Sequence, residues 1–292
     1  MLPATVPADL TEGFAVGEIR PVSGGSISHV FVGQTPTGPI FFKSRPHPPA
    51  DFFEREAAGL RALRATGTVP VPEVLRQRAS GLALEWIEHE DQPGGDRTAI
   101  GAEEFGRGLA SLHSHVGPHF GSIDDRPHGY LGSVGLDLRD HAEWSASYLQ
   151  DRVLPLARQA VAVGRLEPSA LPLVDWLVNR GPEVCGPPEP PTLVHGDLWS
   201  GNRVIGNDGR HWLVDPSAHY GHREIDLALM RLFGGFAEAT FAAYMEVFPL
   251  APGWQHRTAL FQLAPLLANT LMHGPTFSES VMERLRRATA AN

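Results

Sequence analysis

Three side chains that could act on a hydroxyl group and a metal ion, Asp197, Asn202 and Asp215, lie close together in the sequence. Asp197 and Asn202 are five residues apart in PTLVHGDLWSGNRVIG (191–206), and Asp215 ends the apolar segment WLVD. On a constrained loop, Asp197 would orient and deprotonate a hydroxyl, while Asn202 would hold a divalent cation. Hard cations prefer oxygen ligands, so Asp215 is expected to complete the metal site. Taken singly, the same residue types are ordinary turn formers.

Lys43, which follows the apolar residues GPIFF (38–42), is the only lysine in the chain, so 23 of the 24 basic residues are arginines. Coding bias alone could leave one lysine by chance. However, the helix predicted at 51–65 places Glu56 on its apolar face, where a carboxylate needs a partner unless it reaches solvent at the rim. We expect Lys43 to be that partner. A compact ammonium can also contact phosphates in a place that the wide arginine fork cannot take.

A glycine-rich turn, SGGSISHVF (23–31), lies between two predicted strands. Backbone amides around Gly24, Gly25 and Ser26 can approach phosphate groups, because glycine leaves room for close contact. Such a turn is weak evidence when it stands alone. The segment lacks the Gly-x-x-x-x-Gly-Lys-Ser/Thr pattern, which argues against a P-loop nucleotide-binding site.

The elements around these residues predict a small β-rich N-terminal lobe. Apolar and β-branched residues at 27–32 and 39–42 are separated by the turn signal TPTG (35–38). Asp51 is a plausible start for the helix that carries Glu56. Two more short strands are expected at 73–76 and 82–87.

The polar segment HEDQPGGD (89–96) separates this lobe from a part with helical periodicity. Inside that part, period-two segments within 192–215 flank Asn207-Asp208-Gly209, which predicts a hairpin. The predicted fold class is therefore α+β and bilobal, with a small antiparallel-sheet lobe (1–88) and a larger, mainly helical lobe (89–292). The helices are expected at 101–115, 139–163, 168–180, 224–232, 236–247, 254–273 and near 278–290.

Composition limits the possible classes of protein. The formal net charge of −9 argues against nucleic acid or an anionic membrane as the main partner. No apolar run approaches the roughly 20 residues of a membrane span, and no signal peptide is evident. The single cysteine, Cys185, excludes an internal disulfide, and the 14 histidines form no zinc-ligand pattern. A cytoplasmic globular protein is expected.

The order of these features along the chain is informative. A glycine-rich turn is followed by a strand lysine, a helix glutamate, a hinge, a catalytic acid, a metal-binding amide and a metal-binding acid. This is the order of functional parts in a protein-kinase-like phosphotransferase. Asp226, in REIDLALM, is expected to hold the catalytic loop by accepting backbone N–H bonds.

The motifs resemble one family in particular, the fructosamine kinase (ketosamine 3-kinase) family, which is related to aminoglycoside phosphotransferases and choline kinases. The likeness is strongest in two segments, LVHGDLWSGN (193–202) and DPSAHYGHREIDLALMRLFGGF (215–236). The wider superfamily shares His-Gly-Asp followed by Asn. Three features resemble the fructosamine kinases more narrowly: Trp199-Ser200-Gly201, Asp-Pro in place of Asp-Phe-Gly, and the run Gly-His-Arg-Glu-x-Asp-Leu-Ala. The likeness extends over nearly the whole chain.

The resemblance implies that ATP with Mg²⁺ is the phosphate donor, and that the acceptor is a sugar hydroxyl of a glycated amine, either a small molecule or a glycated lysine. The phosphate would go to the sugar 3-hydroxyl, which would make the protein a deglycation enzyme. Trp199 would cover the sugar ring, although it could equally pack the loop. The adenine would bind backbone groups at the hinge, which comprises Glu85, Trp86, Ile87 and Glu88.

Two departures from the family pattern affect what can be carried over. Ser26 stands where several members have a cysteine, so a thiol switch is not expected here. The segment ANTLMHGPTF (268–277) differs from the family's Leu-Asn-His-x-x-x-Phe-Gly motif. Because that segment borders the acceptor pocket in the family fold, the details of substrate binding are not carried over. His273 is a candidate to line that pocket, although a lone histidine near a helix end is more often structural.

Two alternatives to a ketosamine kinase remain at this point. One is another small-molecule kinase of the superfamily, acting on an aminoglycoside, a choline-like alcohol or a different sugar. The other is a nucleotide-binding protein without catalysis. The second alternative is disfavoured because the expected functional residues are all present, namely Lys43, Glu56, Asp197, Asn202 and Asp215.

Overall fold

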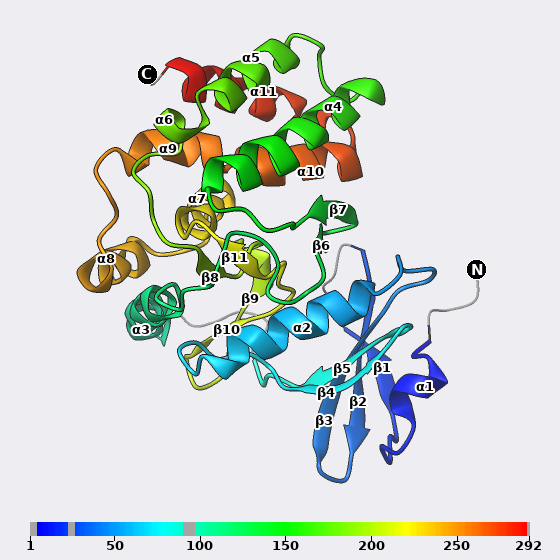
Figure 1. Ribbon diagram of the computed structural model, residues 1–292. Helices are drawn as coiled ribbons and strands as arrows, with labels where there is room; N and C mark the ends of the chain where they lie inside the picture. The colour runs from blue at the N-terminus through cyan, green and yellow to red at the C-terminus, as the bar shows by residue number, and fades with distance from the viewer. Residues whose placement is uncertain (1–4, 23–26, 90–96, 291–292) are drawn as a thin grey trace.

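The computed structural model describes residues 5–22, 27–89 and 97–290. Its N-terminal part contains a five-stranded antiparallel sheet with the strand order β1-β2-β3-β5-β4 (Figure 1). All four predicted strands of this part belong to the sheet, with ends shifted by a few residues. The strands are β1 (Ile19–Pro21), β2 (His29–Thr35), β3 (Gly38–Ser44), β4 (Val74–Arg78) and β5 (Gly81–Glu85).

The alternation of side chains along β3 explains how Lys43 reaches the site. Ile40 and Phe42 pack with Leu10 of the short helix α1 (Ala8–Thr11) in a small core on one face of the sheet. Because successive side chains of a strand point to opposite faces, Phe41 and Lys43 face the other way. On that side lies helix α2 (Phe52–Ala65), which Figure 1 shows between the sheet and the helical part of the molecule.

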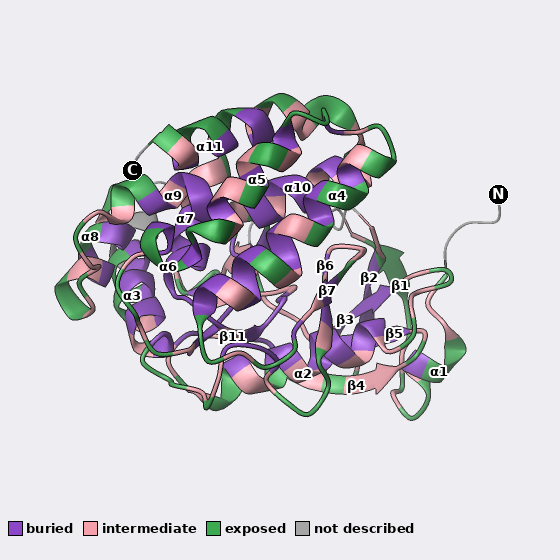
Figure 2. Cartoon of the chain, turned by 45° about the horizontal axis from the view of Figure 1, so that its top comes forward, coloured by how far each residue is buried: buried purple, intermediate pink, exposed green. Residues whose placement is uncertain are grey.

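The C-terminal part is mainly helical, as predicted, and its helices bury one large apolar core (Figure 2). The predicted helix 254–273 is two helices, because the chain breaks at Gln262, whose buried side chain donates to Ala228 O and accepts from Arg284. The helices are α3 (Arg97–Leu112), α4 (Leu154–Ala162), α5 (Ala170–Asn179), α6 (Gly181–Val184), α7 (Glu224–Phe233), α8 (Glu238–Val247), α9 (Trp254–Phe261), α10 (Leu263–His273) and α11 (Ser278–Ala290).

The segment predicted as one helix at 139–163 begins later than expected. Its first residues are irregular, and the helix then runs as a π-helical stretch, η1 (Ala146–Val153), into α4. Before it lies a hairpin that the sequence analysis did not predict, formed by β6 (His128–Leu131) and β7 (Val134–Asp137). This hairpin lies beside α2 and forms part of the site described below.

The catalytic candidates are held by two small antiparallel pairs of strands. One pair joins β8 (Thr192–Val194) to β11 (His219–Gly221), and the other joins β9 (Arg203–Ile205) to β10 (His211–Leu213). The second pair is the predicted hairpin around Asn207-Asp208-Gly209. A one-turn 3₁₀ helix, η2 (Ser200–Asn202), completes the loop between β8 and β9.

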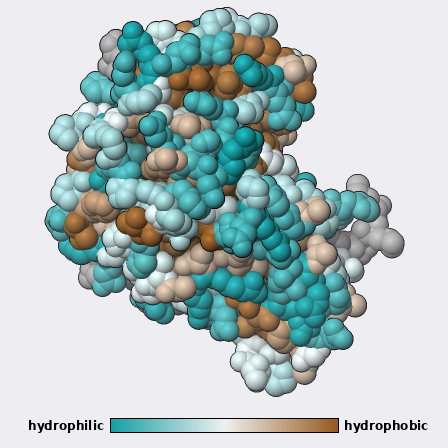
Figure 3. Space-filling view, in the orientation of Figure 1, coloured by the Kyte–Doolittle hydropathy of each residue, from teal (hydrophilic) through white to brown (hydrophobic). Residues whose placement is uncertain are grey.

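The outer surface is predominantly hydrophilic on the face shown in Figure 3, with hydrophobic side chains gathered in separate patches. Among the described residues, no helix is both long enough and apolar enough to span a membrane. The lobe boundary near residue 88 stays a prediction, because residues 90–96 lie outside the described part of the chain.

Candidate active site

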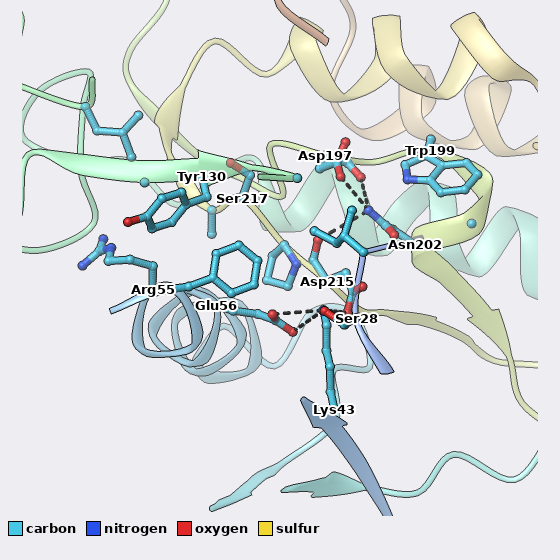
Figure 4. A pocket seen from close by; sticks show the side chains of 18 residues that line it. Ser28, Lys43, Arg55, Glu56, Tyr130, Asp197, Trp199, Asn202, Asp215 and Ser217 are labelled. Carbon is cyan, nitrogen blue, oxygen red and sulfur yellow. Dashed lines mark hydrogen bonds and ion pairs between the residues drawn. The ribbon is translucent and has the colours of Figure 1, made fainter. Parts of the chain in front are cut away.

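The five residues that the sequence analysis grouped together surround one cavity of about 320 Å³ (Figure 4). A second cavity of about 190 Å³ lies against the sheet. Lys43, Gly201 and Asp215 line both cavities, so the two spaces meet at these residues. The first cavity is bounded by the catalytic loop, α2 and the β6–β7 hairpin, and the second by strands β3 and β5 and the segment that follows β5.

Lys43 is almost fully buried and contacts two carboxylates. Its Nζ lies 2.9 and 3.0 Å from the two carboxylate oxygens of Glu56, which confirms the predicted pair, and 2.8 Å from Asp215 Oδ1. Burial would lower the pKa of Lys43, but the charges of Asp215 and Glu56 outweigh it and raise the pKa above its ordinary value. Burial, with a further contribution from the charge of Asp215, raises the pKa of Glu56 to about 7 against the opposing charge of Lys43.

Asp226 holds the loop that carries Asp197. Its carboxylate accepts hydrogen bonds from the backbone N–H groups of His195 (2.7 Å) and Gly196 (2.9 Å), which confirms the predicted role. The buried ring of His113 lies 3.2 Å from the same carboxylate. Gly196 has a φ of 79°, and a Cβ there would lie 2.1 Å from Ser217 O. The loop therefore requires glycine at the position before Asp197.

Asp197 lines the first cavity, next to Asn202 (Figure 4). The amide nitrogen of Asn202 donates to both the main-chain oxygen and the Oδ2 of Asp197, each at 2.9 Å. Burial, together with the charges of Asp215 and Asp226, raises the pKa of Asp197 to about 7 despite the hydrogen bond from Asn202. The carboxylate thus holds its proton more tightly than an exposed aspartate does.

Asp215 lies two residues after the end of strand β10 and has a left-handed backbone conformation, with a φ of 53°. This conformation is uncommon for a residue other than glycine and occurs most often at functional sites. Its main-chain oxygen accepts a hydrogen bond from Asn202 Nδ2 at 3.4 Å. Within the described residues, the Asn202 side chain makes its hydrogen bonds through Nδ2, so Oδ1 is free for a ligand. A carboxylate and an amide oxygen are the donor types that suit Mg²⁺.

The second cavity includes three of the four predicted hinge residues. Glu85, Trp86 and Ile87 line it, together with apolar side chains of the sheet. Glu88 is not among the residues that line it, and its carbonyl oxygen accepts a hydrogen bond from the backbone of Asn207. The predicted phosphate-binding residues Gly24, Gly25 and Ser26 lie outside the described residues, so their role stays a prediction.

The two predicted acceptor-binding residues lie in different surroundings. Trp199 lines the first cavity and is about 39% exposed; its ring lies against Gly201 and in edge contact with Phe233. This position is compatible both with covering a ligand and with packing the loop. His273 is exposed at the end of α10, where it contacts the ring of Phe277, and it is not among the residues that line the cavity. Its role in acceptor binding stays a prediction.

The sequence analysis missed the wall of the first cavity opposite the catalytic loop. Arg55 and Phe52 of α2 line this wall, as does Tyr130 of β6. Ser217 lines the cavity as well, and its buried Oγ has no hydrogen-bond partner among the described residues. A buried hydroxyl without a partner is uncommon, and here it is available to a polar ligand. The one early signal was the position of Arg55 directly before Glu56.

Comparison with known proteins relates this site to one family. The model of the fructosamine kinase family matches residues 4–291. A probable ketoamine kinase of Enterococcus faecium is 34% identical over 283 residues, covering 92% of this chain and 94% of the relative. A probable ketoamine kinase of Thermus thermophilus is 35% identical over 284 residues and covers 95% of each chain. The chloroplastic protein-ribulosamine 3-kinase of Arabidopsis thaliana is 30% identical over 282 residues, covering 94% of this chain and 83% of the relative.

Solved structures show the same relationship. A crystal structure from Thermobifida fusca, described as a fructosamine-3-kinase, is 34% identical and superposes with a TM-score of 0.88, covering 97% of this chain and 98% of the other. An aminoglycoside phosphotransferase in complex with ADP and hygromycin B is 17% identical, with a TM-score of 0.64 and coverage of 97% and 96%. At that identity, the second similarity shows a shared fold alone.

Proposed function

This chain belongs to the fructosamine kinase family, and from that membership we propose that it transfers the γ-phosphoryl group of ATP to the C3 hydroxyl of a ketosamine. The observation that carries the proposal is the position of Asp197, Lys43 and Asp215 around one cavity, with a second cavity meeting it at the lysine. A phosphate donor in the second cavity would thus present its terminal phosphate to an acceptor in the first.

Asp197 is the proposed base. It would accept the proton of the acceptor hydroxyl while the hydroxyl oxygen forms a bond to the γ-phosphorus of ATP. The bond between that phosphorus and the bridging oxygen breaks, and ADP leaves with the electron pair. Asn202, by donating to Asp197 Oδ2, would keep the carboxylate oriented toward the acceptor.

Lys43 is the proposed contact to the α- and β-phosphates. Its ammonium is buried and held by Glu56, so its position is fixed before the nucleotide binds. Such preorganised charge stabilises the transition state without reorganisation during the reaction. The aromatic and apolar lining of the second cavity, including Trp86 and Phe41, suits an adenine ring.

Asn202 and Asp215 are the proposed ligands of Mg²⁺. The free Oδ1 of Asn202 and the partly exposed carboxylate of Asp215 supply hard oxygen donors on the same side of the cavity. When bound, the ion would neutralise phosphate charge and help to orient the γ-phosphoryl group.

The C3 position gives the reaction a chemical consequence. A ketosamine has its amine on C1 and its carbonyl at C2, so it can enolise toward C1. A phosphate on C3 then leaves far more readily than a hydroxyl, and addition of water releases the free amine, inorganic phosphate and a deoxydicarbonyl sugar. Phosphorylation at this one position would therefore reverse glycation without a separate lyase.

The test is to incubate the protein with ATP, Mg²⁺ and ribulose-lysine or fructose-lysine. We expect a new phosphate monoester by phosphorus NMR, followed by free lysine and inorganic phosphate. Asp197→Asn serves as the control for contaminating activity. Consumption of choline or of an aminoglycoside with no transfer to either ketosamine would overturn the proposal in favour of another phosphotransferase of the superfamily.

A further inference from the structure

Helix α2 is attached to the C-terminal part of the molecule by alternate residues of the segment 122–130. Each of these residues contacts the beginning of α2 or the two residues before it. Ser122 accepts from Arg55 Nη2 (3.3 Å), Asp124 accepts from Arg55 Nη1 (2.7 and 2.8 Å), Arg126 pairs with Glu54 (2.6 Å), His128 contacts Asp51 (2.6 Å) and Tyr130 donates to Ala50 O (2.9 Å).

The Arg55–Asp124 pair differs from the other contacts in burial and geometry. Arg55 is only 7% exposed, and one of its nitrogens contacts both oxygens of Asp124. Ser122 Oγ joins the pair by donating to Asp124 Oδ1 at 3.1 Å. By contrast, the Arg126–Glu54 pair is more than 40% exposed on both sides, and such surface pairs contribute little. Loss of Asp124 would leave a buried guanidinium without its carboxylate.

Arg55 is also the residue directly before Glu56. The two side chains leave neighbouring positions of the same helical turn, Arg55 toward the segment 122–130 and Glu56 toward Lys43 (Figure 4). The backbone that joins the two residues is hydrogen-bonded helix. A change in the position of Arg55 therefore also moves Glu56. Asp51, just before α2, has a φ of 56°, an unfavourable conformation that its contacts to His128 and Tyr130 help to hold.

From this arrangement we propose that Asp124 is a positioning residue for the nucleotide site. By holding Arg55 it fixes the start of α2, and so keeps Glu56 in contact with Lys43. The inference rests on the proposed function only in assigning Lys43 to nucleotide phosphates. It predicts that a residue absent from the lining of the second cavity controls nucleotide affinity through α2.

The experiment measures ATP binding by calorimetry, in the presence of Mg²⁺ and without an acceptor. Asp124→Asn should weaken ATP affinity by about tenfold, within the range of couplings between contacting residues. Glu54→Gln, which removes the exposed pair between the same two elements, is the matched control and should change affinity less than about twofold. Thermal unfolding of each variant shows whether the fold is retained.

A double-mutant cycle separates positioning from general damage to the fold. If Asp124 acts through Glu56, then Asp124→Asn should have almost no further effect on ATP affinity in a Glu56→Gln background. An equal loss in both backgrounds, or unchanged affinity in the single variant, would overturn the proposal. If Asp124→Asn does not fold, Arg55→Lys keeps the positive charge but loses the fork geometry, and it must meet the same two criteria.

This result is independent of the acceptor's identity. Failure of ketosamine phosphorylation would leave the calorimetric cycle unchanged, since no acceptor is present. Conversely, normal ATP affinity in the Asp124→Asn variant would contradict the positioning role even in an active ketosamine kinase.

Discussion

The ammonium of Lys43 lies 2.8 Å from the carboxylate of Asp215, which joins the N-terminal sheet to the segment after β10. Lys43 comes from strand β3, and Asp215 lies 172 residues further along the chain. The same ammonium also contacts Glu56 of α2. Three separate elements therefore meet at one ammonium group, which makes the site sensitive to the size and shape of the cationic side chain.

Lys43→Arg should retain the fold but lose most activity. The substitution keeps the charge, but the wide guanidinium cannot contact Glu56, Asp215 and a phosphate from the same buried position. We expect kcat/KM to fall by about 100-fold or more, equivalent to about 2.7 kcal/mol of transition-state stabilisation. Steady-state kinetics, with circular dichroism as the control for folding, test this. Near-normal kcat/KM in a folded variant would contradict the assigned role.

Asp197→Asn and Asp215→Asn should have different effects. Asparagine at 197 keeps the shape but cannot accept a proton, so turnover should be abolished while binding of ATP with Mg²⁺ stays nearly intact. Asparagine at 215 removes a proposed metal ligand and a partner of Lys43, so nucleotide affinity and the response to Mg²⁺ should weaken together. Calorimetric titration of both variants is the measurement. Equal losses of ATP affinity would show that the division of roles is wrong.

Gly196→Ala should disrupt the catalytic loop far more than a similar change elsewhere. Both Gly196 and Gly164 have a positive φ. A Cβ at position 196 would lie 2.1 Å from Ser217 O, whereas a Cβ at position 164 would meet no neighbouring group within 4 Å. Gly164→Ala should therefore cost only about 1 kcal/mol, the cost of the left-handed conformation. Urea unfolding and turnover measure the two variants. We expect Gly196→Ala to be less stable than Gly164→Ala and to be inactive, and equal behaviour of the two would refute the steric argument.

Protonation of buried histidines should lower the free energy of unfolding as the pH falls below about 6.5, whereas Glu56 and Asp197, whose pKa values are raised in the folded protein, should oppose this loss. Burial, with a further contribution from the charge of Arg152, lowers the pKa of His219 to about 3 in the folded protein, and burial lowers that of His222 to about 4. Between those values and 6.5, the ordinary value, the unfolded chain binds protons that the folded chain does not. Each histidine should therefore contribute a loss of up to about 1.4 kcal/mol per pH unit in that interval.

Denaturant titrations at pH 7 and pH 5 test this dependence. Relative to the wild type, His219→Gln should lose less stability between pH 7 and pH 5, because it removes one of the groups that bind a proton in the unfolded chain and not in the folded one. The exposed His256 is the matched control, and His256→Gln should keep the wild-type difference. Equal changes in stability between pH 7 and pH 5 in the wild type and the His219→Gln variant would contradict the assignment.

The sequence was sufficient to predict the parts of the site that carry a local signal. Lys43 and Glu56 could be paired because Lys43 is the single lysine, on a strand, and Glu56 is an acid on the apolar face of a helix. In the structure, Lys43 Nζ lies 2.9 Å from Glu56 Oε1. Asp226 could be assigned to the catalytic loop, and its carboxylate accepts two backbone hydrogen bonds there.

The wall of the first cavity opposite the catalytic loop could not be predicted in the same way. Strands β6 and β7 are four residues each, and each contains one glycine, so their alternation is too short to indicate a hairpin. Arg55 and Asp124 are 69 residues apart, and nothing in either local sequence indicates the other. The break at Gln262, by contrast, has a local signal: Pro265 has no N–H to donate to Phe261 O and is tolerated in the first turn of a helix, here the start of α10.

The burial of Lys43 also determines how the protein itself reacts with sugars. Glycation begins when an uncharged, accessible amine attacks the carbonyl carbon of a reducing sugar, and lysine side chains are the usual nucleophiles. Within these 292 residues there is one lysine, 4% exposed and held between two carboxylates that keep it protonated. The remaining cations of the surface are guanidinium groups, which stay charged at neutral pH. A protein proposed to reverse the glycation of amines thus offers no lysine amine at its own surface for the same damage.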